Sequence, residues 1–305
     1  MGATLLIMAA GMGSRYGGNK QVDGIGPNNE ILMEYSIYDA IRAGFTKVVF
    51  IIKPDMVELM HDLCGDRIAQ MKTKDGENVE VGYAFQDFSS VPDFYTIPAE
   101  RTKPFGTVHA LLCAADAVDG PCCVINADDY YGIGAYQTMY DHLMQMPAEG
   151  HAAMVGYLLK NTASLHGTVS RGVCAMENGK LCGVKETLKI QLYPDGSLRD
   201  LAEDVELSPD NVVSMNFWGF APSVFPQLKA YFEDFLRNEA GENLKAECLL
   251  PVMVDHLMKA GKMEVAVLES HDKWFGMTYQ EDRPIVAEEL KKLHEAGVYP
   301  ETLRV

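Results

Sequence analysis

A glycine-rich turn carrying two cations lies near the amino end of the chain. Residues 5–26 read LLIMAAGMGSRYGGNKQVDGIG, where the apolar run Leu5–Ala10 leads into glycines, and Arg15 and Lys20 follow. A strand that runs into a glycine loop presents backbone N–H groups, which bind phosphates well. Two nearby cations indicate that more than one phosphate is neutralised. We therefore expect this loop to hold a nucleoside triphosphate.

Two other phosphate-binding loops do not fit these residues. A P-loop needs G-x-x-x-x-G-K-S/T, but Lys20 follows Asn19, and Gln21 replaces the hydroxyl that would bind magnesium. A dinucleotide loop needs G-x-G-x-x-G, followed by an acidic residue at the end of the next strand. Gly11 and Gly13 lack the third glycine, and the next apolar run ends in Lys-Pro. Both interpretations are weak.

Two adjacent carboxylates stand at the end of a second apolar run. The segment PCCVINADDYYG ends in Asp128 and Asp129. In open α/β sheets, ligands bind at the carboxyl ends of strands, so this position favours a binding role. The alternative is that one aspartate caps a helix beginning near Gly134 and that the other is only solvated.

Apolar runs and helical spacing alternate along the first half of the chain. A helix is predicted over Ile31–Ala43, a strand over Lys47–Lys53, a helix over Met56–Met71 and a strand over Val79–Phe85. Continuous β-branched runs are typical of strands that are covered on both faces. The pattern predicts an α/β fold with a mixed, mostly parallel central sheet flanked by helices.

The second half is richer in antiparallel signals. Two apolar segments meet at Asn178-Gly179, a strong hairpin sequence. Helices are then expected over Phe225–Asn238, Leu249–Lys259 and Tyr279–Ala296, the last broken by Pro284, with a strand over Met263–Leu268. Because no linker is evident, we expect one domain over 1–305, with a nucleotide-binding half (about 1–150) and an acceptor-binding half with a β-rich subregion (about 151–305).

Composition limits the possible partners. The 305 residues carry a formal charge of −17, which argues against a nucleic-acid or membrane surface, because both need a basic face. No apolar run is long enough to span a membrane. The seven cysteines show no CxxC spacing, as expected for free thiols in a cytoplasmic protein. A homo-oligomer is compatible with this composition.

Several segments, taken in order, resemble the nucleotidyltransferase superfamily, above all its sugar-1-phosphate nucleotidylyltransferases. AAGMGSRYGGNKQ resembles the loop A-A-G-x-G-S/T-R with a following lysine, and PFGTVHAL resembles P-x-G-T-A-x-A-L. VINADDYYG resembles L-x-G-D-x-x-F, and the hairpin ending in Gly183–Glu186 resembles G-x-V/I-x-x-V/I-x-E-K-P. NFWGF, from Asn216, resembles N-x-G-x-Y/F. The short gap between Arg15 and Lys20 looks more like the cytidylyl- and molybdopterin-nucleotide relatives.

The resemblance implies roles for these positions. Arg15, Lys20 and Asp128 would be catalytic, and Asp128 would hold Mg²⁺. Thr107 is also expected to be the N-cap of a helix. The implied nucleotide-binding residues are Ala9, Ala10, Gly11, Met12, Gly13, Ser14, Gly106 and Thr107; the implied acceptor-binding residues are Glu186, Asn216 and either Lys189 or Lys185.

One segment departs from the family pattern. The family's W-x-D-x-G-T motif supplies a second metal aspartate, but the matching stretch begins at Trp274 and places Gly276 at the aspartate position. Asp272, two residues before the tryptophan, is the candidate replacement ligand. Water is the alternative, because Mg²⁺ keeps several waters and needs few protein carboxylates.

The sequence therefore predicts a Mg²⁺-dependent nucleotidyltransferase. It would join a nucleoside triphosphate to a phosphorylated small molecule, most simply a sugar 1-phosphate, and release pyrophosphate. One alternative is a cytidylyltransferase for a non-sugar phosphate such as choline phosphate, with an aromatic cage formed by Tyr130, Tyr131, Trp218 and Phe220. The other is a catalytically silent regulatory protein that binds nucleotide sugars.

Overall fold

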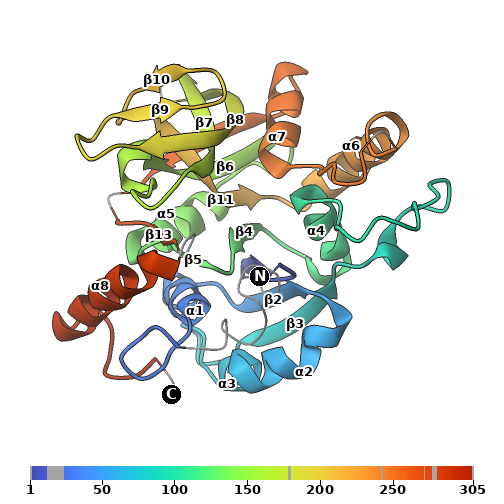
Figure 1. Ribbon diagram of the computed structural model, residues 1–305. Helices are drawn as coiled ribbons and strands as arrows, with labels where there is room; N and C mark the ends of the chain where they lie inside the picture. Colours follow the sequence, from blue (N-terminus) through green and yellow to red (C-terminus); the bar gives the residue numbers. More distant parts are fainter. Residues whose placement is uncertain are drawn as a thin grey trace.

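A computed structural model describes residues 2–11, 24–177, 180–241, 243–270, 272–276 and 280–303. These residues form a mixed sheet of 11 strands with helices on both faces (Figure 1). Four parallel strands form one side of it, in the order β4 (Cys122–Asn126), β1 (Thr4–Met8), β2 (Lys47–Ile52) and β3 (Glu80–Phe85). Nearly every residue of β1 and β2 is buried, as their continuous apolar runs predict.

Antiparallel pairing begins where β11 (Val212–Phe220) joins β4. β6 (His151–Leu158) pairs antiparallel with β11 and parallel with β12 (Glu264–Glu269). The long strands β7 (Val169–Glu177) and β8 (Lys180–Leu192) then form, with β9 (Leu198–Asp200) and β10 (Val205–Leu207), the β-rich lobe at the top of Figure 1. The α/β class and the mixed sheet are thus confirmed, whereas Asn178-Gly179 lies outside the described residues.

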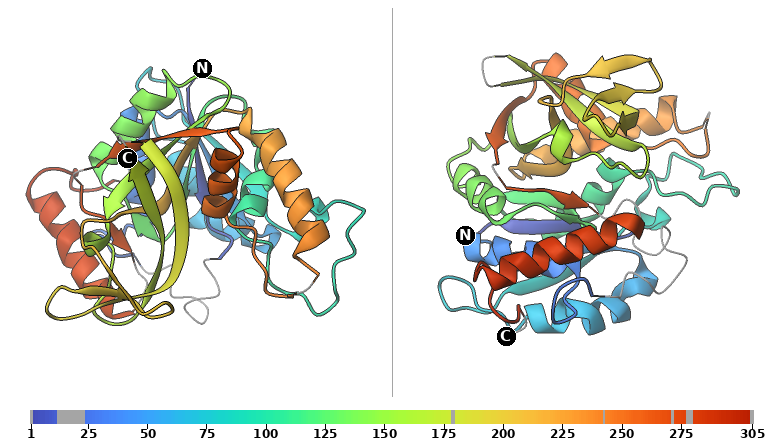
Figure 2. Two further views of the ribbon diagram at one scale, coloured as in Figure 1. Left: turned by 90° about the horizontal axis from the view of Figure 1, so that it is seen from above. Right: turned by 60° about the vertical axis from the view of Figure 1, so that its left-hand side comes forward.

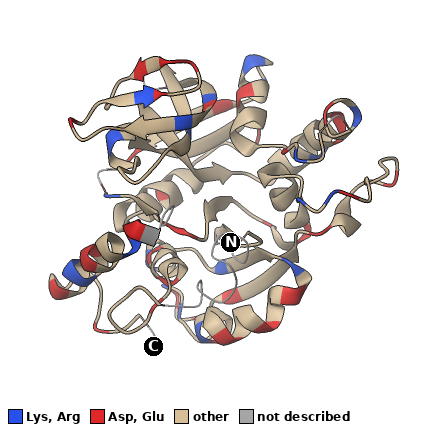
Figure 3. Cartoon of the chain, in the orientation of Figure 1, with Lys and Arg blue, Asp and Glu red and all other residues tan. Residues whose placement is uncertain are grey.

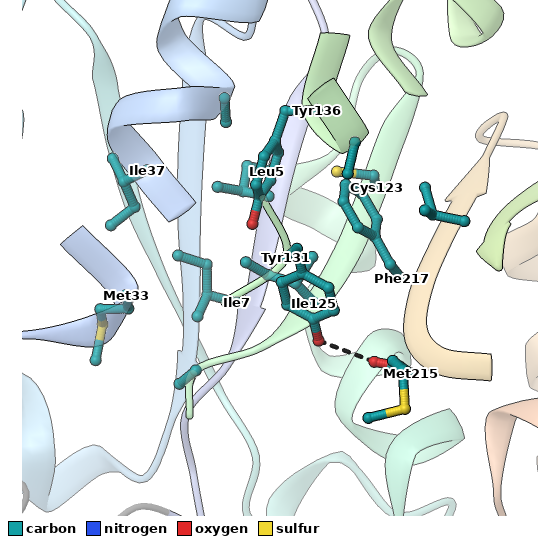
Figure 4. Packing of buried hydrophobic residues seen from close by; sticks show 14 of the residues in the cluster. Leu5, Ile7, Met33, Ile37, Cys123, Ile125, Tyr131, Tyr136, Met215 and Phe217 are labelled. Carbon is teal, nitrogen blue, oxygen red and sulfur yellow. Dashed lines mark hydrogen bonds between the residues drawn. The ribbon is translucent and has the colours of Figure 1, made fainter. Parts of the chain in front are cut away.

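Two hydrophobic cores cover the two faces of the sheet, and Figure 2 shows the helices on either side of it. α1 (Leu32–Ala43) and α5 (Ile133–Leu143) cover one face, where Leu5 and Ile7 of β1 pack with Ile37 and Tyr136 (Figure 4). α4 (Thr107–Cys113), α6 (Val224–Asn238) and α7 (Leu250–Lys259) cover the other. The alternation of side chains along each strand divides the apolar residues between the cores.

A third, smaller cluster joins α8 (Arg283–Glu295) to α1 and to a two-stranded ladder of β5 (Asp129–Tyr130) and β13 (Phe275–Gly276). Pro284 lies in the first turn of α8, so it begins this helix and does not break it. Charges of both signs are interspersed on the outer helices, including α8 (Figure 3). None of the described helices is long and apolar enough to cross a membrane.

The predicted helix over Met56–Met71 is wrong as a single element. The chain forms a 3₁₀ turn (Pro54–Met56), α2 (Val57–Met60), a π turn (His61–Gly65) and α3 (Asp66–Ile68). Gly65 is the last residue of the π turn, and a Cβ there would lie 2.3 Å from the Tyr83 hydroxyl oxygen. The irregular winding accompanies this close approach of β3.

Candidate active site

The carboxyl ends of β1 to β4 lie along one edge of the sheet. Ala9 and Ala10 follow β1 there and are buried, and the Ala9 N–H donates to Ile51 O (2.9 Å). The Ala127 N–H donates to Met8 O (3.3 Å), which ties the end of β4 to the same place. Gly11 is exposed. The glycine loop therefore starts between β2 and β4, while Met12, Gly13, Ser14, Arg15 and Lys20 lie outside the described residues.

Gly106 and Thr107 are tied to the end of β3. Gln86, the residue after this strand, donates from Nε2 to Gly106 O (3.0 Å). Gly106 has φ of +94°, and a Cβ there would lie 2.7 Å from Cys248 O, so glycine is required. The sequence reasoning missed Gln86, although a polar residue directly after a predicted strand was an available signal.

The prediction that Thr107 is the N-cap of α4 is wrong. Gly106 is the N-cap, and Thr107 is the first helical residue. The Thr107 hydroxyl oxygen instead accepts the N–H of Leu250 (2.7 Å), the first residue of α7. The Thr107 hydroxyl therefore links α4 to α7 and does not cap α4.

Asp129 is the more buried member of the carboxylate pair. It is 7% exposed, and its Oδ2 accepts the side-chain amide of Asn126 (2.8 Å) and lies 3.1 Å from the Tyr131 hydroxyl. Burial and the neighbouring Asp128 carboxylate raise the pKa of Asp129 above its usual value. Asp128, in the turn after β4, is half-buried. A solvated role for Asp129 is therefore wrong.

Asp272 lies at the amino end of α5. Its Oδ2 accepts the Ala135 N–H (2.9 Å) and the Ser270 hydroxyl (3.2 Å). A Cβ at Gly132 or Gly134 would lie 2.1 Å or 2.9 Å from the Asp272 side chain, so these glycines make room for it. Asp272 thus caps α5, a role that the sequence alternative gave to the Asp128–Asp129 pair. These contacts do not support the prediction that Asp272 is a metal ligand.

Gly276 lies next to Asp129. The two residues pair across the β5–β13 ladder, and a Cβ at residue 276 would lie 2.9 Å from Asp129 Oδ1. The same Cβ would lie 2.2 Å from the Trp274 ring. No side chain fits at this position without a shift of the tryptophan, and the carboxylate beside it belongs to Asp129.

Asn216 has strained backbone geometry beside the carboxylates. Its φ is +60°, and it lies where the β11–β6 register shifts between Ser214 and Trp218. Its Nδ2 lies 3.5 Å from Asn126 Oδ1, and its own Oδ1 is buried without a hydrogen-bond partner in the described part of the chain. Strain and an unsatisfied acceptor together are typical of a binding site.

Glu186 and the two candidate lysines have different surroundings on β8. Glu186 pairs with Gly172 of β7 and is half-buried; burial raises its pKa, and the charge of Arg171 lowers it. Lys185 is exposed and forms an ion pair with Glu203. Lys189 is also exposed. Of the predicted acceptor residues on β8, only Glu186 lies in a partly desolvated environment.

Arg171 of β7 is a residue that the sequence reasoning missed. Burial lowers its pKa, and the charges of Asp129, Glu186 and Asp128 act in the opposite direction. Its guanidinium lies over the Trp274 ring, with its carbon 5.1 Å from the ring centre. The signal in the sequence was one basic residue within the strand segment VSRGVCAME.

The proposed aromatic cage does not exist. Tyr130, Tyr131, Trp218 and Phe220 are each at most 3% exposed and pack inside the cores. The Tyr131 hydroxyl lies 2.9 Å from Met215 O (Figure 4), and Trp218 stacks on Phe220. These four rings therefore offer no open pocket for a quaternary ammonium group.

Comparison with solved structures shows the same fold. Three similar structures have TM-scores of 0.62, 0.59 and 0.58 and share 14%, 17% and 10% sequence identity with this chain. They are named as a glucose-1-phosphate thymidylyltransferase from Bacillus anthracis with sucrose, a UDP-glucose pyrophosphorylase with UDP-glucose, and the inositol-1-phosphate CTP transferase from T. maritima. The alignments cover 95%, 96% and 96% of this chain and 96%, 99% and 96% of the respective structures.

A search of curated protein sequences gave no match. The family model described as nucleotidyl transferase, in contrast, matches residues 5–275. This span includes the glycine loop, the Asp128–Asp129 pair, the β7–β8 lobe and Trp274. The chain therefore belongs to the nucleotidyl transferase family.

Proposed function

We propose that this protein transfers a nucleotidyl group from a nucleoside triphosphate to a sugar 1-phosphate and releases pyrophosphate. One observation carries the proposal: the start of the glycine loop, the Gln86–Gly106 contact and Asp128 all lie at the carboxyl edge of β1 to β4. β11 runs antiparallel to β4 and brings Asn216 to Asn126 at the same edge. Two of the similar structures are named as enzymes of sugar-phosphate nucleotidyl transfer.

The reaction needs positioning and charge stabilisation more than proton transfer. A phosphate oxygen of the acceptor attacks the α-phosphorus, the bond from that phosphorus to the bridging oxygen breaks, and pyrophosphate leaves with the electron pair. The nucleophile is already an anion, so no general base is required. In this proposal Arg15 binds the β- and γ-phosphates as a planar fork, and Lys20 offsets charge at the α-phosphate.

The carboxylates after β4 fit a divalent cation. Asp128 and Asp129 are adjacent acidic side chains at the end of β4, and carboxylate oxygens are the ligands that Mg²⁺ prefers in proteins. We propose Asp128 as the Mg²⁺ ligand, with waters and triphosphate oxygens completing the shell. The ion would supply neutralisation of the triphosphate charge. Among the described residues, no cluster of three or more histidine, cysteine or acidic side chains forms a metal cage.

The acceptor half supplies hydrogen-bond acceptors for hydroxyl groups. Glu186 is half-buried, and Asn216 Oδ1 is a buried acceptor without a partner in the described residues. We propose that both bind sugar hydroxyls, because an unsatisfied buried acceptor gains a partner when a hydroxyl donates to it. Lys189, exposed on the outside of β8, would contact the acceptor at most peripherally.

A cytidylyltransferase that acts on a non-sugar phosphate is the second candidate. It is favoured by the similarity to the inositol-1-phosphate CTP transferase from T. maritima and by the short spacing between Arg15 and Lys20. Choline phosphate is not supported as the acceptor, because the four aromatic rings that would form its cage are buried. Inositol 1-phosphate is therefore the appropriate non-sugar acceptor to test.

The test is pyrophosphate release from each common nucleoside triphosphate, paired with glucose 1-phosphate, other sugar 1-phosphates, inositol 1-phosphate and choline phosphate. We expect turnover with Mg²⁺ for at least one sugar 1-phosphate and none in EDTA. Turnover with inositol 1-phosphate alone would select the second candidate. Silence across the panel, combined with thermal stabilisation by a nucleotide sugar, would identify a regulatory binding protein and reject the enzyme.

A further inference from the structure

The Arg171 side chain is held rigidly by backbone carbonyl groups and a ring. Its Nε donates to Thr162 O (3.2 Å), its Nη1 donates to Ser170 O (2.8 Å), and its Nη2 also donates to Thr162 O. The guanidinium lies over Trp274. A guanidinium has five N–H groups, so two of them, one on each terminal nitrogen, are not used by these contacts. A fixed side chain loses little further entropy when it binds a ligand.

Arg171 forms no direct ion pair in the described part of the chain, although the charges of Asp129, Glu186 and Asp128 act on it from a greater distance. The exposed cations nearby do have one: Arg199 pairs with Asp204, and Lys185 pairs with Glu203. Arg171 is only partly exposed, and burial lowers its pKa. A partly buried cation that donates only to neutral carbonyl groups has capacity for an anion.

Arg171 lies near both groups of candidate residues. On β7 it pairs with Thr187, the residue after Glu186, and its charge acts on both Glu186 and Asp129. Trp274, on which it stacks, is two residues before Gly276, the partner of Asp129. A phosphorylated acceptor whose hydroxyls bind Glu186, and whose phosphate points towards Asp128, would bring that phosphate near Arg171.

We propose that Arg171 binds the phosphate group of the acceptor, an inference that rests on the proposed transfer reaction. The remaining N–H of each terminal nitrogen forms a fork that matches two phosphate oxygens. Arg171 also distinguishes phosphorylated acceptors from the free sugars. Lys185 and Lys189, the candidates from the sequence, are exposed, and Lys185 is already paired. The competing explanation is that Arg171 only offsets the charges of Asp129 and Glu186.

The kinetic test uses Arg171→Lys and Arg171→Gln, with Arg199→Gln as a matched control on the same lobe. We expect Arg171→Gln to raise the KM for the phosphorylated acceptor by about 10- to 100-fold, as for loss of a charge-assisted hydrogen bond. The KM for the triphosphate and the inhibition constant of the unphosphorylated sugar should stay unchanged. Arg171→Lys should recover only part of the acceptor affinity. Equal changes in both KM values, or no change in either, would overturn the proposal.

A second measurement uses the wild-type protein and does not depend on folding of the variants. Phenylglyoxal modification is mapped by mass spectrometry on the peptide that contains Arg171, with glucose 1-phosphate, inositol 1-phosphate or glucose present. Protection by a phosphorylated compound but not by glucose supports the proposal. An unreactive Arg171, or one that no phosphorylated compound protects selectively, rejects it. Selective protection in a protein without turnover would reject the transfer reaction while the anion site stands.

Discussion

Gly276 pairs with Asp129 across the β5–β13 ladder, and a Cβ on residue 276 would lie 2.9 Å from Asp129 Oδ1 and 2.2 Å from the Trp274 ring. The position that carries an aspartate in the family motif thus admits a side chain only if Trp274 shifts. The buried carboxylate beside it belongs to Asp129, which follows Asp128 in the chain. The two neighbouring carboxylates of the candidate site, Asp128 and Asp129, therefore both follow the end of β4.

Gly276→Ala should destabilise the protein. Its methyl group would overlap the Trp274 ring, and overpacking of this kind costs about 1–3 kcal/mol. Gly241→Ala is the control, because a Cβ there has nothing within 4 Å. Urea unfolding of both variants measures the difference; equal stability of the two would show that the tryptophan moves without cost.

Asp272→Ala should reduce stability and leave turnover intact. The variant loses the cap on the Ala135 N–H, which is worth about 0.5–2 kcal/mol. The affinity for Mg²⁺, measured as the concentration dependence of turnover, should not change. A large rise in the Mg²⁺ requirement would instead restore Asp272 as a metal ligand.

Asp128→Asn should abolish most turnover without unfolding the protein. Loss of a carboxylate that positions the metal ion removes several kcal/mol of transition-state stabilisation, so we expect a decrease of at least about a hundredfold. Mn²⁺ binding in the presence of a non-hydrolysable triphosphate, followed by electron paramagnetic resonance, should weaken in parallel. Asp116→Asn, an exposed site, serves as the control and should match wild type in both measurements.

Arg15→Ala and Lys20→Ala should each abolish turnover, because these cations would neutralise the triphosphate and the charge that develops at its α-phosphorus. Both variants should unfold at the wild-type urea concentration. Thermal stabilisation by the triphosphate should decrease in Arg15→Ala. Near-wild-type turnover in either variant would remove that residue from the mechanism.

Asp39 should make stability depend on pH. Burial raises its pKa to about 8, although the Tyr299 hydroxyl donates to it (2.6 Å). Between about pH 4 and 8 the unfolded chain loses this proton while the folded chain keeps it, so stability falls as pH rises, by up to about 1.4 kcal/mol per pH unit. Asp39→Asn should flatten this slope in urea unfolding at pH 5 to 8.5. An unchanged slope would assign the pH dependence to other groups.

The sequence by itself determined the fold class and the family. Continuous apolar runs such as Lys47–Lys53 predicted the buried parallel strands, because such runs need cover on both faces. The order of the motifs from Gly11 to Asn216 indicated nucleotidyl transfer, and the family match over residues 5–275 supports that activity class. These conclusions need only short stretches of sequence, because each apolar run and each loop motif spans a few consecutive residues.

Only the tertiary structure decided which polar side chains work together. Asp272 was predicted as a metal ligand from its position in the sequence, and only the fold shows that it caps α5, a helix that begins at Ile133. The hydroxyl of Thr107 accepts the Leu250 N–H, and strand pairing and Trp274 hold Arg171 where its charge acts on both Glu186 and Asp129. These partners are far apart in the chain, and only folding decides which of them meet.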